Sequence, residues 1–78
     1  MSTIRYFAAA AEAAGRADET VSATTVAELR SLLAEQHGAE LARVLTRCAI
    51  LVNGERSDDG AALTEADVVD VLPPFAGG

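Results

Sequence analysis

The residues of this chain that could do chemistry stand at its C-terminal end, in the run Leu72-Pro73-Pro74-Phe75-Ala76-Gly77-Gly78. The pair Gly77-Gly78 is a poor way to stabilise a fold, because glycine buries no side chain and loses the most backbone entropy on ordering. It offers instead an unhindered carboxylate on a thin strand, which fits a narrow slot in another protein. We therefore expect Gly78 to carry the chemistry.

The two prolines before this end strengthen that interpretation. Pro73 and Pro74 favour an extended, polyproline-like path and cannot donate a hydrogen bond to a sheet. From Pro73 to Gly78, six extended residues reach on the order of 20 Å, which is enough to enter the active site of a neighbouring protein. We predict one small folded domain over residues 1–72 and a flexible tail over residues 73–78.

The overall charge excludes some classes of partner. The chain has 78 residues and a formal net charge of −6, with six arginines and no lysine. An acidic chain is a poor ligand for nucleic acid or for an anionic membrane, since both require a basic surface. We expect neither as a partner.

Single residues elsewhere have structural explanations. Cys48 is the only cysteine and stands at the head of an apolar run, so we predict that it packs in the core and forms no internal disulfide. His37 falls near a predicted helix end, and with no second histidine to share a metal we expect it to be structural, with no metal site. No segment is typical of a secretory signal or of a membrane span, which predicts a cytoplasmic protein.

The first part of the chain predicts two strands around a short helix. Alternation over residues 3–8 predicts a strand with Ile4 and Tyr6 on one face and with Arg5 and Phe7 on the other. An alanine-rich stretch over residues 8–14, followed by a glycine, predicts a short helix, and residues 20–23 predict a second strand.

The clearest helix signal is a capping box. Thr25 can cap the helix start, and Glu28, three residues on, can return a hydrogen bond to the backbone of Thr25. Apolar residues then recur at helical spacing, at Val26, Leu29, Leu32 and Leu33. We predict that the helix ends near His37, with Gly38 as a left-handed cap.

The remainder predicts a further helical turn, a hairpin and a last strand. Apolar residues around Leu41 predict the helical turn, and residues 49–52 predict a buried central strand. Asn53-Gly54 favours a type I′ turn into an edge strand over residues 55–57, and residues 68–72 predict the last strand. This order predicts an α+β fold, a β-grasp (ubiquitin-like) roll whose mixed sheet is covered by one main helix.

An ordered set of short matches then identifies a resemblance. The whole chain resembles the small subunits of molybdopterin synthase (molybdopterin-converting factor subunit 1), within the ubiquitin-like sulfur-carrier family. The matching runs are Ile4-Arg5-Tyr6-Phe7-Ala8, Thr25-Val26-Ala27-Glu28-Leu29, Leu51-Val52-Asn53-Gly54-Glu55, Asp67-Val68-Val69 and the run from Leu72 to Gly78.

The resemblance implies a sulfur-transfer chemistry at Gly78. An E1-like adenylating enzyme would use ATP to form the acyl-adenylate of Gly78, and a rhodanese-like protein or a cysteine desulfurase would supply sulfur. The resulting thiocarboxylate would donate sulfur to cyclic pyranopterin monophosphate in the large subunit of molybdopterin synthase, during molybdenum cofactor biosynthesis. The chain itself would bind no cofactor and would not be catalytic alone.

The resemblance also assigns roles to further residues. Residues inserted into the partner would be Gly77, Ala76, Phe75, Pro74 and Pro73. The interface with the large subunit would use Phe7, Leu72 and the position of Arg56, which is apolar in the family. The chain also departs from the family at Phe75, where valine is frequent, and at Glu65-Ala66-Asp67, where Asp-Gly-Asp is frequent.

Three alternatives remain open. The same chemistry could serve thiamine or cysteine synthesis. A ubiquitin-like protein modifier would use the same adenylation to form an amide with a target lysine. A β-grasp interaction module would use the fold without chemistry at Gly78.

Overall fold

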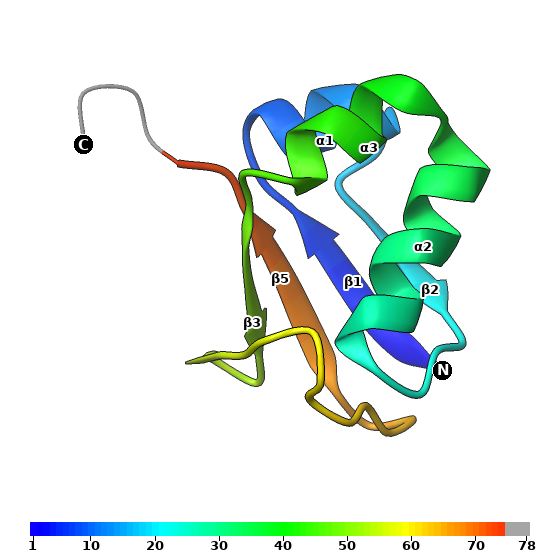
Figure 1. Ribbon diagram of the computed structural model, residues 1–78, viewed down its shortest axis with the longest axis vertical. Helices are drawn as coiled ribbons and strands as arrows, with labels where there is room; N and C mark the ends of the chain where they lie inside the picture. Colours follow the sequence, from blue (N-terminus) through cyan, green and yellow to red (C-terminus); the bar gives the residue numbers. More distant parts are fainter. Residues whose placement is uncertain (75–78) are drawn as a thin grey trace.

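The computed structural model describes residues 1–74, and in this range the strands form one five-stranded mixed sheet in the order β2-β1-β5-β3-β4. Figure 1 shows β2, β1, β5 and β3 in this order. β1 (Ser2–Tyr6) and β5 (Val68–Leu72) pair in parallel at its centre. β2 (Asp18–Val21) flanks β1, while β3 (Ala49–Val52) and the two-residue β4 (Glu55–Arg56) lie on the other side of β5. The predicted β-grasp fold is confirmed. The predictions for Phe75, Ala76, Gly77 and Gly78 lie outside the described residues.

The helices follow from local signals. α1 (Ala9–Ala14) ends at Gly15, whose φ of 75° and ψ of 19° are the left-handed cap that glycine adopts readily. α2 (Val26–His37) is the main helix, and α3 (Ala39–Leu45) is the predicted further helical segment. Among residues 1–74, none of the helices is long and apolar enough to cross a membrane.

One apolar core joins the sheet to the helices. Inward-facing residues of β1 and β5 are buried together with residues of α2 and α3: Ile4, Tyr6, Val69, Val71, Leu29, Leu33, Leu41 and Leu45. Cys48 is also buried in this cluster, as predicted. The alternation of the strands therefore leaves the opposite face of the sheet without a helical cover.

The predicted central strand was misplaced. Residues 49–52 do form β3, but β3 is the fourth strand of the sheet and only Ile50 is fully buried in it. β5 takes the central position because it pairs with β1 on one side and with β3 on the other. An apolar run shows that a strand packs well, but it carries no information on which strands lie beside it.

The second strand also begins earlier than predicted, at Asp18 rather than at residue 20. Its register with β1 pairs Arg5 with Asp18 and Ser2 with Val21. Backbone pairing with β1 therefore defines the strand, whereas the prediction rested on its single buried apolar residue, Val21. The strand ends at Val21, two residues before the predicted end, because its pairing with β1 stops where Val21 meets Ser2, the first residue of β1.

Two details at the ends of α2 differ from prediction. The hydroxyl of Thr25 accepts from the Glu28 amide at 3.1 Å, but the Glu28 carboxylate accepts from the Thr24 amide at 2.8 Å instead of from Thr25. Gly38 has the expected positive φ of 89°, but its ψ of −169° is extended rather than left-handed helical. Gly38 is also the N-cap of α3, where its carbonyl accepts from the Ala42 amide at 3.1 Å, and an N-cap residue lies outside the helical conformation.

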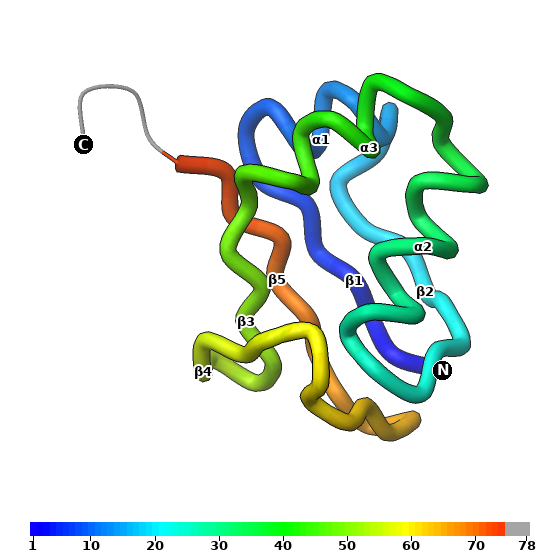
Figure 2. Tube along the Cα trace, in the orientation of Figure 1, coloured from blue at the N-terminus to red at the C-terminus, as the bar shows by residue number. Residues whose placement is uncertain are grey.

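The hairpin prediction is confirmed. Asn53 and Gly54 have φ of 52° and 86°, as the type I′ turn requires, and β4 follows at the sheet edge (Figure 2). β4 ends at Arg56, one residue before the predicted end at Ser57. Ser57 still makes one backbone hydrogen bond to β3, from its amide to the Ile50 carbonyl at 2.9 Å.

Candidate functional site

The chain leaves the middle of the sheet at the end where β1 also ends. In register, Tyr6 lies beside Val71, and Ala49 lies opposite Leu72. Pro73 is buried and Pro74 is exposed. The chain therefore leaves from the centre of the sheet, between β1 and β3, and is exposed at Pro74, the last described residue.

The sheet face without helices, here called the open face, gathers the predicted interface residues. Its members are the outward-facing residues Thr3, Arg5, Phe7, Asp18, Thr20, Ala49, Leu51, Arg56, Val68, Asp70 and Leu72. The structure thus brings Phe7, Leu72 and Arg56 onto one surface, beside the point where the chain leaves the sheet. Sequence spacing alone could not place Arg56 on this surface, because its position depends on the pairing of β4 with β3.

One row of the open face crosses all five strands. By register it runs Asp18, Arg5, Asp70, Leu51, Arg56. Arg5 donates to Asp70 through Nε at 2.5 Å and through Nη2 at 2.8 Å, and its guanidinium carbon lies 5.9 Å from the centroid of the Phe7 ring. This bidentate contact fixes the Arg5 side chain beside the most exposed aromatic residue of the open face.

The opposite side of the sheet holds a hydrogen-bonded network. The Tyr6 hydroxyl donates to Glu19, and Nε2 of His37 lies 2.6 Å from the same carboxylate. Burial alone would raise the pKa of Glu19, but these hydrogen bonds and the charges of His37 and Arg16 outweigh it, so the pKa is lowered. Burial, together with Glu19, raises the pKa of Tyr6. His37 thus ties the end of α2 to β1 and β2.

A second network holds the loop before β5. Asn53 donates through Nδ2 to Asp67 at 2.8 Å, and its Oδ1 accepts from the Val68 amide at 2.9 Å. The hydrogen bond from the Thr64 amide, with that from Asn53, lowers the pKa of Asp67. Sequence reasoning recognised Asn53 only as a turn residue, and nothing in the local sequence signals its bond to a strand fifteen residues later.

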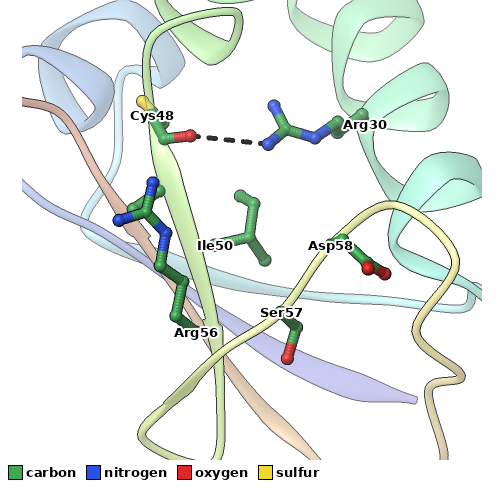
Figure 3. Close-up of a pocket in the computed structure, with 7 residues that line it drawn as sticks. Arg30, Cys48, Ile50, Arg56, Ser57 and Asp58 are labelled. Atoms are coloured by element: carbon green, nitrogen blue, oxygen red, sulfur yellow. Dashed lines mark hydrogen bonds between the residues drawn. The ribbon is translucent and has the colours of Figure 1, made fainter.

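A hollow of about 380 Å³ opens at the edge of the sheet, lined by Arg30, Cys48, Ala49, Ile50, Arg56, Ser57 and Asp58 (Figure 3). Arg30 donates to the carbonyls of Leu45 at 2.6 Å and Cys48 at 3.4 Å, and to the Asp59 carboxylate at 2.8 Å. It therefore links α2 to the start of β3 and to the loop after β4. This role was missed, because an arginine on the exposed side of a helix is usually solvated.

Neither the Cys48 thiol nor a metal site offers an alternative chemistry within residues 1–74. The Cys48 thiol donates to the Val44 carbonyl at 3.2 Å, and burial raises its pKa, so it is a poor thiolate nucleophile. Residues 1–74 contain no group of three His, Cys, Asp or Glu side chains arranged to hold a metal ion. The geometry therefore directs attention to the open face and to the chain end that leaves beside it.

Comparison with known families decides the relationship. The sequence matches the ThiS family over residues 4–78. The chain belongs to the ThiS family. It is a ubiquitin-like sulfur carrier with the β-grasp fold, as the sequence resemblance predicted. No curated protein matched it.

Solved structures support this membership of the ThiS family. SAMP1 from Haloferax volcanii is 29% identical, with a TM-score of 0.85 and coverage of 99% of this chain and 98% of that one. A chain in a complex of subunits 1 and 2 of molybdopterin-converting factor from Helicobacter pylori is 29% identical to this one. The TM-score is 0.73, and the match covers 99% of this chain and 97% of that one. CysO from Mycobacterium tuberculosis, at 18% identity, a TM-score of 0.81 and coverage of 96% and 100%, shows a likeness of fold alone.

Proposed function

We propose that this ThiS-family chain is the sulfur-carrying small subunit of a molybdopterin synthase. The observation that carries the proposal is the position of Phe7 and Leu72 on the open face, beside the point from which the chain leads to Gly78. The likeness to a chain of the Helicobacter pylori complex of subunits 1 and 2 of molybdopterin-converting factor supports it, since that chain is 29% identical and the match covers nearly the whole of both chains.

The proposed chemistry takes place at the carboxylate of Gly78. A carboxylate with an ordinary pKa of about 3.5 is ionised at neutral pH and is a poor acyl electrophile. An E1-like enzyme joins it to the α-phosphate of ATP with release of pyrophosphate. A persulfide of the sulfur donor then displaces AMP, and a second thiol cleaves the resulting acyl disulfide. Gly78 is left as a thiocarboxylate, and the two donor thiols leave as a disulfide.

The thiocarboxylate then serves as the nucleophile in the large subunit. Its soft sulfur attacks cyclic pyranopterin monophosphate, and two such deliveries supply the two sulfurs of the dithiolene. The folded domain supplies no acid or base to these steps. Its contribution is to dock through the open face and to present a chain end without a Cβ at Gly77 and Gly78, which leaves room for a nucleotide or a narrow channel.

The open face gives docking a physical basis. Phe7 is exposed, and Leu72, Leu51 and Val68 are half-buried on the same face. Covering these side chains releases apolar surface from water, at about 25 cal/mol per Å². The tail segment begins at the edge of this patch, so docking there brings the chain end to the partner that accepts sulfur.

Intact-mass analysis tests the proposal. The full-length chain is incubated with ATP, the E1-like enzyme of the same organism and a sulfide source. We expect a mass increase equal to replacing one oxygen by one sulfur, and then sulfur transfer to the pterin on addition of the large subunit. An unchanged mass with an activator that loads its other carriers would refute sulfur loading at Gly78. Loading without transfer in the presence of the large subunit would refute the molybdopterin assignment and leave thiamine synthesis, cysteine synthesis or protein modification.

A specific observation also favours a second candidate, a protein modifier. The Haloferax volcanii relative at 29% identity is a small archaeal modifier protein. This function needs the same adenylation of Gly78, but the acyl group ends on a lysine of another protein. High-mass adducts that carry this chain and resist thiol reduction would support it, and their absence under sulfur-limited growth would count against it.

A further inference from the structure

Two of the four charged residues on the open face, Arg5 and Asp70, compensate each other, and Arg56 is the cation that remains. In the row across the five strands, Arg5 lies between Asp18 and Asp70 in register and donates both of its short hydrogen bonds to Asp70. Arg5 and Asp70 therefore compensate each other, and Asp18 forms no ion pair within residues 1–74. Arg56 lies at the far end of the same row, separated from Asp70 by Leu51.

Arg56 is the cation of this row that has no partner among residues 1–74. It is exposed on β4, and within that range it forms no ion pair and its side chain makes no hydrogen bond. Its side chain extends along β3 toward Cys48, at the end of the sheet where the chain leaves (Figure 3). Asp58 lines the same hollow, but it accepts from the Gly60 amide at 3.1 Å and does not pair with Arg56.

The position of Arg56 relative to the apolar patch is set by the sheet. Strands lie about 4.8 Å apart, so β4 is about 10 Å from β5, from which the chain leaves. A partner that covers Phe7, Leu72 and Leu51 therefore reaches Arg56 at the rim of the contact. Among the described residues, Leu51 is the direct cross-strand neighbour of Arg56, so no carboxylate separates Arg56 from the apolar patch.

We infer that Arg56 binds an aspartate or glutamate side chain of the large subunit and selects that partner at the rim of the open face. This inference rests on the proposed function, because it takes the large subunit as the docked protein. The guanidinium is a planar fork that matches a carboxylate with two hydrogen bonds. If a partner without a carboxylate at this point covered Arg56, the guanidinium would lose its hydration and gain no ion pair in return.

The charge of the whole chain makes this contact selective. At a net charge of −6, the chain repels acidic protein surfaces in most orientations. On the open face, an acidic side chain of the partner is attracted where it meets Arg56, which forms no ion pair within residues 1–74. One docked orientation is therefore favoured over the others, which is the way in which rim charges contribute specificity.

Calorimetric titration of the full-length chain with the large subunit of the same organism tests this. Arg56→Glu should weaken binding about tenfold or more at low salt and Arg56→Gln less, with the difference shrinking at high salt. Arg43→Glu is the matched control, because it makes the same change in net charge on α3, where Arg43 pairs with Glu40. We expect it to bind within about twofold of the unmodified chain.

The outcomes separate the inference from the proposed function. If the unmodified chain binds and Arg56→Glu binds equally well, or if Arg43→Glu loses as much, the inference is wrong and the proposed function stands. If the unmodified chain does not bind the large subunit, the molybdopterin assignment fails and the inference fails with it. Restored binding of Arg56→Glu by an Asp→Arg or Glu→Arg change in the large subunit would identify the paired residue. Thermal melts check that each variant is folded.

Discussion

The hydroxyl of Tyr6 on β1 donates a hydrogen bond to the carboxylate of Glu19 on β2, and the ring of His37 contacts the pair from α2. The Tyr6 and His37 rings meet edge to face, with centroids 6.1 Å apart. Three elements distant in sequence are thus joined at one partly buried carboxylate. The network lies on the helix-covered side of the sheet and anchors Tyr6, the last residue of β1. Phe7 of the open face follows Tyr6 directly, and the chain leaves the sheet from the neighbouring strand β5.

Tyr6→Phe removes the hydroxyl and keeps the buried ring. Because a hydrogen bond to a charged group contributes about 1.5–3 kcal/mol, we expect a loss of about that size in the free energy of unfolding. Urea unfolding followed by circular dichroism measures it. Ser57→Ala is the control, since it removes an exposed hydroxyl that donates only to the Glu55 carbonyl. Equal urea midpoints for Tyr6→Phe and the unmodified chain would contradict a stabilising role for the network.

Stability should fall in acid through Glu19. The pKa of Glu19 is lower in the folded chain than its ordinary value, so the unfolded chain binds the proton more readily. The contribution of Glu19 is therefore complete above the unfolded pKa, about 4.3, and is lost as the pH falls through the lower folded pKa. Comparing urea unfolding of Glu19→Gln with the unmodified chain at pH 7 and at pH 3 measures this. A stability difference that does not shrink in acid would contradict the prediction.

Arg30→Met should destabilise the edge of the sheet. Methionine keeps much of the apolar stem but removes the Arg30 hydrogen bonds to the Leu45 and Cys48 carbonyls, of which the Leu45 carbonyl still accepts from the Cys48 amide, so we expect a cost of about 1–3 kcal/mol. Chemical denaturation measures the change. Arg43→Met is the matched control, because the Arg43–Glu40 pair is exposed and such pairs add little. Similar losses in the two variants would show that the carbonyl contacts of Arg30 do not stabilise the fold.

Cys48 should not be the group that carries sulfur. Its thiol is buried and its pKa is raised, so N-ethylmaleimide should label it slowly in the native chain and rapidly in guanidinium chloride. Cys48→Ala should still acquire the thiocarboxylate mass increase at Gly78. Loss of sulfur loading in a folded Cys48→Ala variant would move the chemistry from the chain end to the thiol.

Changes at the chain end should stop loading without unfolding the domain. An alanine added after Gly78, or Gly77→Phe, should abolish thiocarboxylate formation, since the reacting carbonyl is displaced or the added side chain blocks a narrow slot. Intact mass and circular dichroism are measured together. Gly60→Ala is the control, because a Cβ there would meet only Asp58 Oδ1 at an ordinary 3.6 Å. Full loading of either chain-end variant would argue against a threaded chain end.

Most elements and the family could be predicted from the sequence, because their signals are local. The capping residue Thr25, the positive φ at Asn53 and Gly54, and the alternation of Ile4 and Tyr6 each depend on neighbours within a few residues. The predicted family membership also came from ordered short runs, and the family match over residues 4–78 confirms it. The role of Gly78 follows from residue type and position alone and remains a proposal.

The tertiary structure decided what depends on pairing between distant segments. It placed β5 at the centre of the sheet, and only the registers of β1, β3 and β4 brought Arg56 into a row with Arg5 and Asp70. It likewise joined Glu19 to His37, eighteen residues apart. Local periodicity states which face of a strand is buried, but strand order and register come from long-range backbone hydrogen bonds and core packing. The open face beside the chain exit therefore exists only in the folded chain.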